Sequence, residues 1–295
     1  MIRWMIFGGA WLALLFSGEC MAAAVDTAAV FAKSVLPALF PMMVLSSLLG
    51  ALPGGRGPRW MIFLETVCFC FLSGSPASAK RVTELCQKDE RFSCLTAEMM
   101  GFCGVVSPLF FLGTLQSRLP QGSGLMLLLC HWMAALLTGL LLWRMGRQRR
   151  IAQPVRETSP EEPVSLLTAL PRAIGQSMQS LLMVLGAMML FGILAALSRS
   201  LVSRLLPPAW QKPELFAVLW AVMEIGGGGL AVADAFPAPL PLLCGLCSFG
   251  GLSIWMQCLL FIGKEIRPGK LLLIRLLHGA MGYLLCLLFT GLRAL

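Results

Sequence analysis

Charged side chains are scarce in this chain. Only 13% of its 295 residues are charged, whereas 58% are hydrophobic and the mean hydropathy is +0.82. Soluble domains are about 25% charged, so 23 basic and 14 acidic side chains cannot cover an apolar protein of this size. The composition therefore excludes a soluble globular protein and predicts an integral membrane protein.

Residues suited to metal or redox chemistry are also few or badly placed. The two histidines, His131 and His278, are far apart in sequence and have no neighbour at ligand spacing, so each is expected to be a helix-packing residue. Most of the eleven cysteines lie in apolar runs, where cysteine acts as a small hydrophobe. Cys244-Gly-Leu-Cys247 has C-x-x-C spacing, but no second such pair accompanies it, so it is weak evidence for a zinc site or a thioredoxin-like redox site. We predict no metal, no cofactor and no structural disulfide.

Sequence motifs for catalysis and ATP binding are missing. There is no G-x-S-x-G, H-E-x-x-H, S-x-x-K or P-loop motif, and Ser78-Ala79-Lys80 has the wrong spacing for a Ser/Lys dyad. An enzyme and an ATP-driven pump are therefore disfavoured. An intramembrane enzyme stays open as a third class, and it would require a nucleophilic serine.

The net charge of +9 reflects membrane topology. The cations lie at segment ends, and their largest cluster begins the polar stretch 144–164 with Arg144, Arg147, Arg149, Arg150 and Arg156. By the positive-inside rule this stretch is cytoplasmic, and its Pro-rich tail PVRETSPEEPVS suits a flexible linker. Nucleic acid is not an expected partner, whereas the lipid bilayer is.

Apolar windows predict an all-α, polytopic protein with about seven to nine membrane segments. We divide the chain into an N-terminal membrane segment (1–27), a first gate-like half (28–143), the linker (144–164) and a second gate-like half (165–295). Residues 1–24 are either a cleaved signal peptide or an uncleaved first span.

Helix-breaking residues interrupt the apolar segments. Residues 69–82 read FCFLSGSPASAKRV, in which Ser75 suits an N-cap and Pro76 a first helical position. Irregular backbone at membrane depth survives only where protein buries it or where it lines a cavity. The run therefore predicts a spanning helix that stops and a half-helix that begins at Ser75.

The pattern recurs three times, in GFCGVVSPLFFLGT (101–114), VMEIGGGGLAVAD (222–234) and CSFGGLSIWMQ (247–257). Two interruptions in each half indicate a transporter with discontinuous helices that meet near the midplane. The alternative is that glycine and proline are simply common in membrane helices. The predicted solute-binding residues are Ser75, Pro76, Ser78, Lys80, Ser107, Gly227, Gly250, Gly251, Ser253 and Gln257.

Charged residues near the interruptions suggest an anionic solute and a coupling ion. Half-helix starts at Ser75 and Ser107 would attract an anion, and Lys80 would add full charge unless it is an interfacial residue. Arg81 is expected in solvent. An intramembrane carboxylate is a candidate functional group, so we expect Glu224, and next Glu65, to bind a proton or sodium ion. Glu98 is as compatible with a structural role as with a functional one.

The motifs FLSGSPASAKRVTEL and FCGVVSPLFFLGTL resemble the paired signature of the YlbJ-type sporulation integral membrane proteins, close to SGYPxGAK and FCNNxSPLFxxG. VLPALFPMMVLSSLLGAL, MEIGGGG, SFGGLSIWMQ and RLLHG resemble the rest of that family in order, over about residues 28–290. These proteins belong with nucleoside-recognition or gate-domain proteins, related to concentrative nucleoside transporters. Ser75, Ser78, Gly104 and Val105 depart from the pattern and remove side-chain hydrogen-bonding groups.

The resemblance implies a multi-pass protein of the cell membrane, in the forespore or mother-cell membrane of a sporulating organism. The expected function is secondary transport of a small, anionic aromatic solute, with dipicolinic acid as the leading candidate. The alternatives are a nucleoside-type solute transporter and a non-transporting scaffold or sporulation assembly factor. A homo-oligomer is compatible with the sequence.

Overall fold

The computed structural model describes residues 2–51, 58–146 and 165–293, and all regular secondary structure in these ranges is helical. The part before the linker contains α1 (Ile2–Leu15), α2 (Ser17–Val30), the π-helix η1 (Phe31–Val35), α3 (Leu36–Ala51), α4 (Arg59–Ser73), α5 (Ala77–Lys88), α6 (Glu90–Ser93), α7 (Thr96–Cys103), the π-helix η2 (Phe110–Thr114), the 3-10 helix η3 (Leu115–Arg118) and α8 (Ser123–Gly146). The part after it contains α9 (Leu166–Leu205), the 3-10 helix η5 (Pro208–Trp210), α10 (Pro213–Met223), α11 (Ile225–Ala235), α12 (Leu240–Phe249), α13 (Gly251–Ile262) and α14 (Pro268–Arg293). Of the predicted linker, residues 147–164 lie outside the described residues.

Five stretches of the described chain are helical, long and apolar enough to cross a membrane: Ser17–Ala51, Ser123–Gly146, Leu166–Leu205, Leu240–Ile262 and Pro268–Leu292. An all-α structure is thereby confirmed for the described residues, with five stretches that are candidates for spanning a membrane. The expected count of seven to nine segments is not confirmed, because several apolar windows form shorter helices. One example is α4, which has 15 residues.

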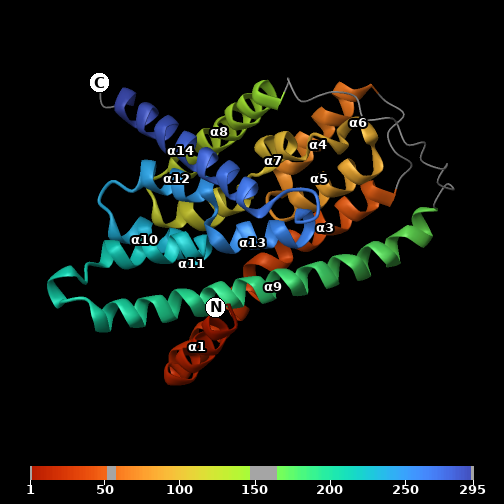
Figure 1. Ribbon diagram of the computed structural model, residues 1–295. Helices are drawn as coiled ribbons and strands as arrows, with labels where there is room; N and C mark the ends of the chain where they lie inside the picture. The colour runs from red at the N-terminus through yellow and green to blue at the C-terminus, as the bar shows by residue number, and fades with distance from the viewer. Residues whose placement is uncertain (1, 52–57, 147–164, 294–295) are drawn as a thin grey trace.

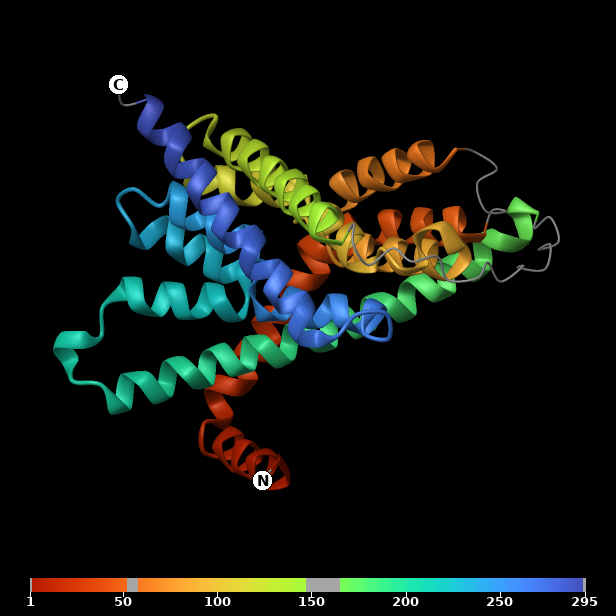
Figure 2. The ribbon, with the colours of Figure 1, turned by 45° about the horizontal axis from the view of Figure 1, so that its top comes forward.

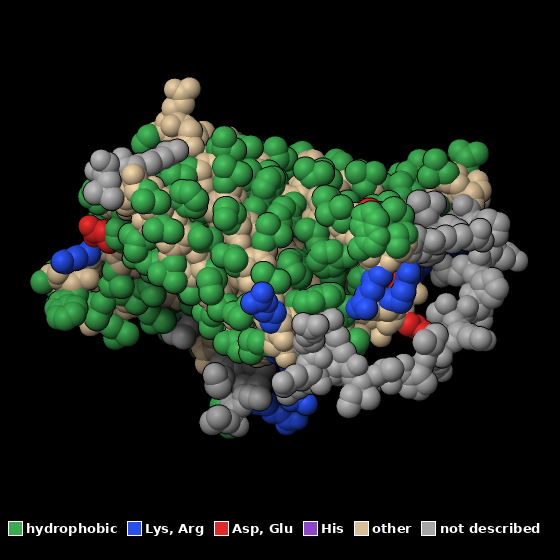
Figure 3. Space-filling model, turned by 90° about the horizontal axis from the view of Figure 1, so that it is seen from above, with side chains coloured by type: hydrophobic (Ala, Val, Ile, Leu, Met, Phe, Trp, Pro, Cys, Tyr) green, Lys and Arg blue, Asp and Glu red, His purple; other side chains and the backbone are tan. Residues whose placement is uncertain are grey.

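The helices form one bundle with a long helix along its side (Figures 1 and 2). That helix is α9, whose 40 residues extend for about 60 Å. α2 and α3 pack against it, while α1 projects away from the bundle. Large apolar side chains cover the outside, such as Leu182 at 62% and Leu273 at 65% exposure, and Figure 3 shows one such face. A surface of this kind is stable against lipid and not against water.

Small residues let several helices approach closely. Between α12 and α14, a Cβ on Gly245 would lie 3.0 Å from the Tyr283 Cβ, and one on Gly279 would lie 3.1 Å from the Gly245 carbonyl oxygen. Between α7 and α8, a Cβ on Gly101 would lie 2.9 Å from the Gly139 Cα. Membrane helices associate through such contacts because lipid gives no hydrophobic drive for them to pack.

Candidate functional site

The first two interruptions cross each other. α4 ends at Ser73 and α5 begins at Ala77, with Pro76 at the cap position, so cap and helix start lie one residue later than the predicted Ser75 cap and Pro76 start. The second interruption separates α7 from the helical turn that begins at Pro108. The Ser75 N–H donates to the Val105 carbonyl at 2.6 Å. We call the contact between these two interruptions the first crossing.

Glycine permits this contact at residue 74. Gly74 has a φ of +70°, and a Cβ there would overlap the backbone of Ser107. Ser107 itself accepts a hydrogen bond from the Leu109 N–H at 3.3 Å, so its hydroxyl caps the helical turn that follows. A left-handed φ together with close backbone approach is a position that only glycine fills without strain.

Arg275 of α14 holds both segments of the first crossing. Its Nη2 donates to the Ser75 hydroxyl at 2.8 Å and to the Cys258 sulfur at 3.3 Å, and its Nη1 donates to the Gly104 carbonyl. The Ser75 and Ser78 hydroxyls lie 3.2 Å apart. Arg275 is only 1% exposed. The sequence reasoning missed this residue, although an arginine inside an apolar segment costs about 2.5–3.5 kcal/mol and is a signal of function.

Both histidines lie beside the first crossing. His131 Nε2 accepts from the Val106 N–H at 2.8 Å, and its Nδ1 pairs with the Ser248 hydroxyl at 2.8 Å. The His278 ring stacks on the His131 ring, with centroids 4.7 Å apart, and its Nε2 lies 3.1 Å from the His131 carbonyl. Both are buried and hydrogen-bonded, as expected of packing residues. Within the described ranges, no three His, Cys, Asp or Glu residues could hold a metal ion, and no disulfide joins any of the eleven cysteines.

The third interruption falls at Glu224, which was expected to precede it. Residues 226–229, which we expected to break the span, are helical within α11. Glu224 is the N-cap of that helix, because its carboxylate accepts from the N–H groups of Gly226 at 2.6 Å and Gly227 at 2.8 Å. The glycines instead allow α11 to pack on α10, since a Cβ on Gly228 would overlap the Ala221 backbone.

The fourth interruption packs against the third. Gly250 and Gly251, between α12 and α13, have φ values of +83° and +72°. A Cβ on Gly251 would lie 3.1 Å from the Ala221 carbonyl oxygen and 3.3 Å from the Ile225 nitrogen. We call this contact the second crossing. Further along α13, the buried Gln257 donates to the Ser253 hydroxyl at 2.9 Å.

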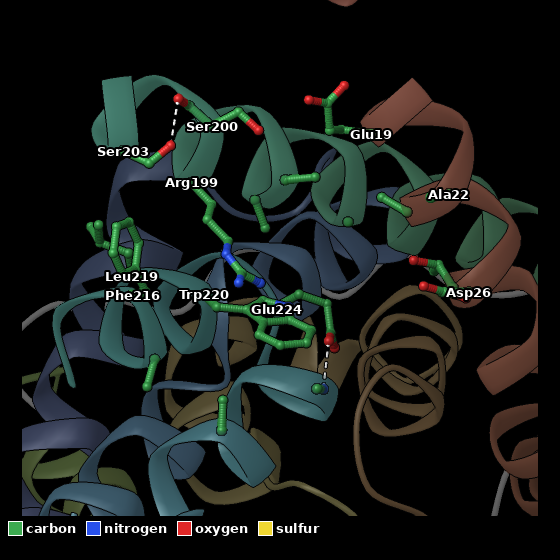
Figure 4. A pocket seen from close by; sticks show the side chains of 18 of the residues that line it. Glu19, Ala22, Asp26, Arg199, Ser200, Ser203, Phe216, Leu219, Trp220 and Glu224 are labelled. Atoms are coloured by element: carbon green, nitrogen blue, oxygen red, sulfur yellow. Dashed lines mark hydrogen bonds between the residues drawn. The ribbon is translucent and has the colours of Figure 1, made fainter. Parts of the chain in front are cut away.

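A cavity of about 950 Å³ reaches the third interruption at Glu224 (Figure 4). We call it the chamber. It lies among α2, α9, α10 and α11, and Glu224 and Gly227 are part of its lining. Its charged lining residues are Glu19, Asp26, Arg199, Glu224 and Asp234. Trp220 and Phe216 supply aromatic surface beside them. The chamber is thus mainly apolar, with an excess of acidic groups.

Other predicted site residues lie away from both crossings. Lys80 Nζ donates to the Ser47 hydroxyl of α3 at 2.6 Å. Arg81, expected in solvent, is 8% exposed and forms an ion pair with Glu65 at 3.4 Å. Glu65 is about half exposed on α4, and Glu98 is buried in the first turn of α7. Lys80 and Arg81 differ from expectation because α5 turns them toward α3 and α4.

No family model matches the chain, and no significant similarity was found to curated proteins or to solved structures.

Proposed function

We propose that this chain is a secondary transporter that moves a small solute past its interrupted helices by alternating access. The observation that supports this is the pairing of the interruptions, because each packs against another and the chamber reaches the third of them at Glu224. Broken helices that meet inside a membrane bundle expose backbone groups and helix ends to a ligand. The two crossings also support the proposal that the two halves are related.

The position of the chamber along α9 indicates which membrane face it lies nearer. Its lining on α9 runs from Met188 to Ser203, about 22 Å along the helix, and on α10 it runs from Pro213 to Glu224. The chamber therefore lies beside the C-terminal half of α9. α9 begins just after the basic linker, so the positive-inside rule supports a chamber nearer the opposite, non-cytoplasmic face.

The charges of the chamber support a cation as the coupling ion. Asp234 is paired with Arg118 at 3.1 Å, which leaves Glu19, Asp26 and Glu224 against Arg199. A partly enclosed cavity with net negative charge attracts cations more strongly than a flat surface does. A proton or sodium ion bound at Glu224 fits this arrangement.

Dipicolinic acid is the first solute to test, following the sequence resemblance, and a nucleoside panel is the second. The scaffold alternative has one observation in its favour, because Gly104 and Val105 bring only backbone polar groups to the first crossing. Membership of the YlbJ-type family and a place in the forespore or mother-cell membrane are part of the same proposal.

Flux measurements distinguish these functions. Purified protein in proteoliposomes should accumulate radiolabelled dipicolinate or a nucleoside under a proton or sodium gradient. Glu224→Gln and Ser107→Val should abolish uptake, whereas Glu214→Gln, an acid-to-amide control in the first turn of α10, should not. No flux of any tested solute under any gradient would instead favour the scaffold.

A further inference from the structure

Arg275 carries a full positive charge in the interior of the bundle, and no carboxylate of the described residues forms an ion pair with it. Its hydrogen-bond acceptors are a backbone carbonyl, a hydroxyl and a thiol, all of them neutral. None of the ion pairs among the described residues includes Arg275. Its Nε is buried and has no hydrogen-bond partner. A buried charge is normally paired, so this guanidinium lacks both a counter-charge and one acceptor.

The surroundings of Arg275 provide further donors for an anion. Ser75 and Ser78 bring two hydroxyls to the same point, 2.8 Å from Nη2 in the case of Ser75. They also mark the start of α5, a helix of 12 residues whose N-terminal end carries partial positive charge. The stacked rings of His131 and His278 lie next to this point and contribute no negative charge when neutral or protonated.

The sequence suggested Lys80 for the role of the cation, but the structure places that side chain elsewhere. Lys80 Nζ is held by Ser47 of α3, whereas Arg275 reaches the interruption from the other end of the chain. Arginine also suits the task better. Its planar fork can donate two parallel hydrogen bonds to one carboxylate, which an ammonium group cannot do.

We infer that Arg275, together with Ser75 and Ser78, binds a carboxylate group of the solute at the first crossing. This deepens the proposed function, on which it rests, by assigning the residues that hold a carboxylate of the solute. The carboxylate accepts from Nε and Nη2 of Arg275, and the Ser75 hydroxyl changes from acceptor to donor. The bound solute then supplies the counter-charge for the Arg275 guanidinium.

Direct binding tests this inference without requiring transport. The full chain in detergent is titrated with radiolabelled isophthalate, an aromatic dicarboxylate, and the neutral diamide isophthalamide is used as competitor. The variants are Arg275→Lys, Arg275→Gln and Ser78→Ala, with Arg118→Gln as an arginine control at an exposed ion pair. Size-exclusion profiles and thermal midpoints identify the variants that fold.

Wild type and Arg118→Gln should bind isophthalate alike, and isophthalamide should not compete. Arg275→Lys should raise the Kd at least tenfold, Arg275→Gln should abolish binding, and Ser78→Ala should raise the Kd several-fold. Among the residues that the structure describes, the Ser78 hydroxyl bonds to Ser75 alone, so this variant keeps the test valid if Arg275→Gln does not fold.

Three results would overturn the inference: wild type that binds no carboxylate, a folded Arg275→Gln with unchanged Kd, or equal displacement of isophthalate by isophthalamide or chloride. The outcome is separable from that of the proposed function. Carboxylate binding without flux would retain this site and reject transport, whereas flux of a neutral nucleoside without carboxylate binding would do the reverse.

Discussion

The amide of Ser75 donates a hydrogen bond of 2.6 Å to the carbonyl oxygen of Val105. Two interrupted segments therefore satisfy each other's backbone groups in the interior of the bundle, which is the condition for irregular structure inside a membrane protein. Arg275 bonds to the same two segments from α14. The first crossing is thus a single unit built from three distant parts of the chain.

Gly74→Ala should disrupt this unit. The added methyl group would meet the Ser107 backbone at a residue whose φ is +70°, so both strain and overlap oppose it. We expect a loss of about 2–4 kcal/mol in the free energy of unfolding, measured by chemical denaturation in detergent. Gly113→Ala is the control, because nothing lies within 4 Å of its Cβ position, and it should change stability by less than about 0.5 kcal/mol. Equal stability of the two variants would contradict the close packing of Gly74 on the Ser107 backbone.

Gly251→Ala tests the second crossing in the same way. Its φ is +72°, and the new methyl group would press on the Ala221 carbonyl and the Ile225 nitrogen. A loss of about 1–3 kcal/mol is expected because the backbone of α10 and α11 cannot easily move aside. Gly269→Ala, with open space around it, serves as the reference. A Gly251→Ala protein as stable as this reference would show that the interruptions do not pack together.

His131 and Ser248 should be energetically coupled. The pair joins α8 to α12 through a buried hydrogen bond of 2.8 Å. His131→Phe leaves both the Ser248 hydroxyl and the Val106 N–H without a partner, which should cost about 2–4 kcal/mol. In a double-mutant cycle with Ser248→Ala, the coupling energy should be about 1 kcal/mol. Purely additive losses would mean that the hydrogen bond contributes nothing beyond packing.

The positions of most helix interruptions could be predicted from the sequence, but the residues that contact them across the bundle could not. Ser-Gly-Ser-Pro and Gly250-Gly251 mark real helix ends because their residues are poor in helix interiors or need a left-handed φ. The glycines after Glu224 misled the prediction, since glycine in a membrane helix also serves close packing. Which residues meet across the bundle is a tertiary property. Nothing local in the sequence links Arg275 to Ser75, from which it is separated by 200 positions.

Lys80→Met tests whether Lys80, as the sequence suggested, or Arg275 binds the solute. Because Lys80 points to Ser47 of α3, its removal should change solute affinity by less than about threefold, while stability should fall by about 1 kcal/mol through the lost hydrogen bond. Ser47→Ala should produce a similar change in stability. Binding that depends on Lys80 as strongly as on Arg275 would restore the original prediction from the sequence.

Glu224 has both a structural role and a proposed coupling role, because its carboxylate caps α11 and it lines the chamber. Two substitutions distinguish these roles. Glu224→Ala removes both functions and should lower the free energy of unfolding by about 0.5–2 kcal/mol, the usual value of an N-cap. Glu224→Gln keeps an oxygen that can accept one of the two hydrogen bonds but cannot bind or release a proton. It should therefore remain nearly as stable as wild type while losing gradient-driven uptake.

The two variants together identify what Glu224 does. Stability in detergent is compared with uptake under imposed proton and sodium gradients, with Glu214→Gln in the first turn of α10 as the matched acid-to-amide variant. If Glu224→Gln retains uptake that still follows the gradient, Glu224 is only a helix cap, and the coupling ion must bind elsewhere in the chamber. If both variants lose uptake but only Glu224→Ala loses stability, the charge of Glu224 couples the ion to the solute independently of its cap.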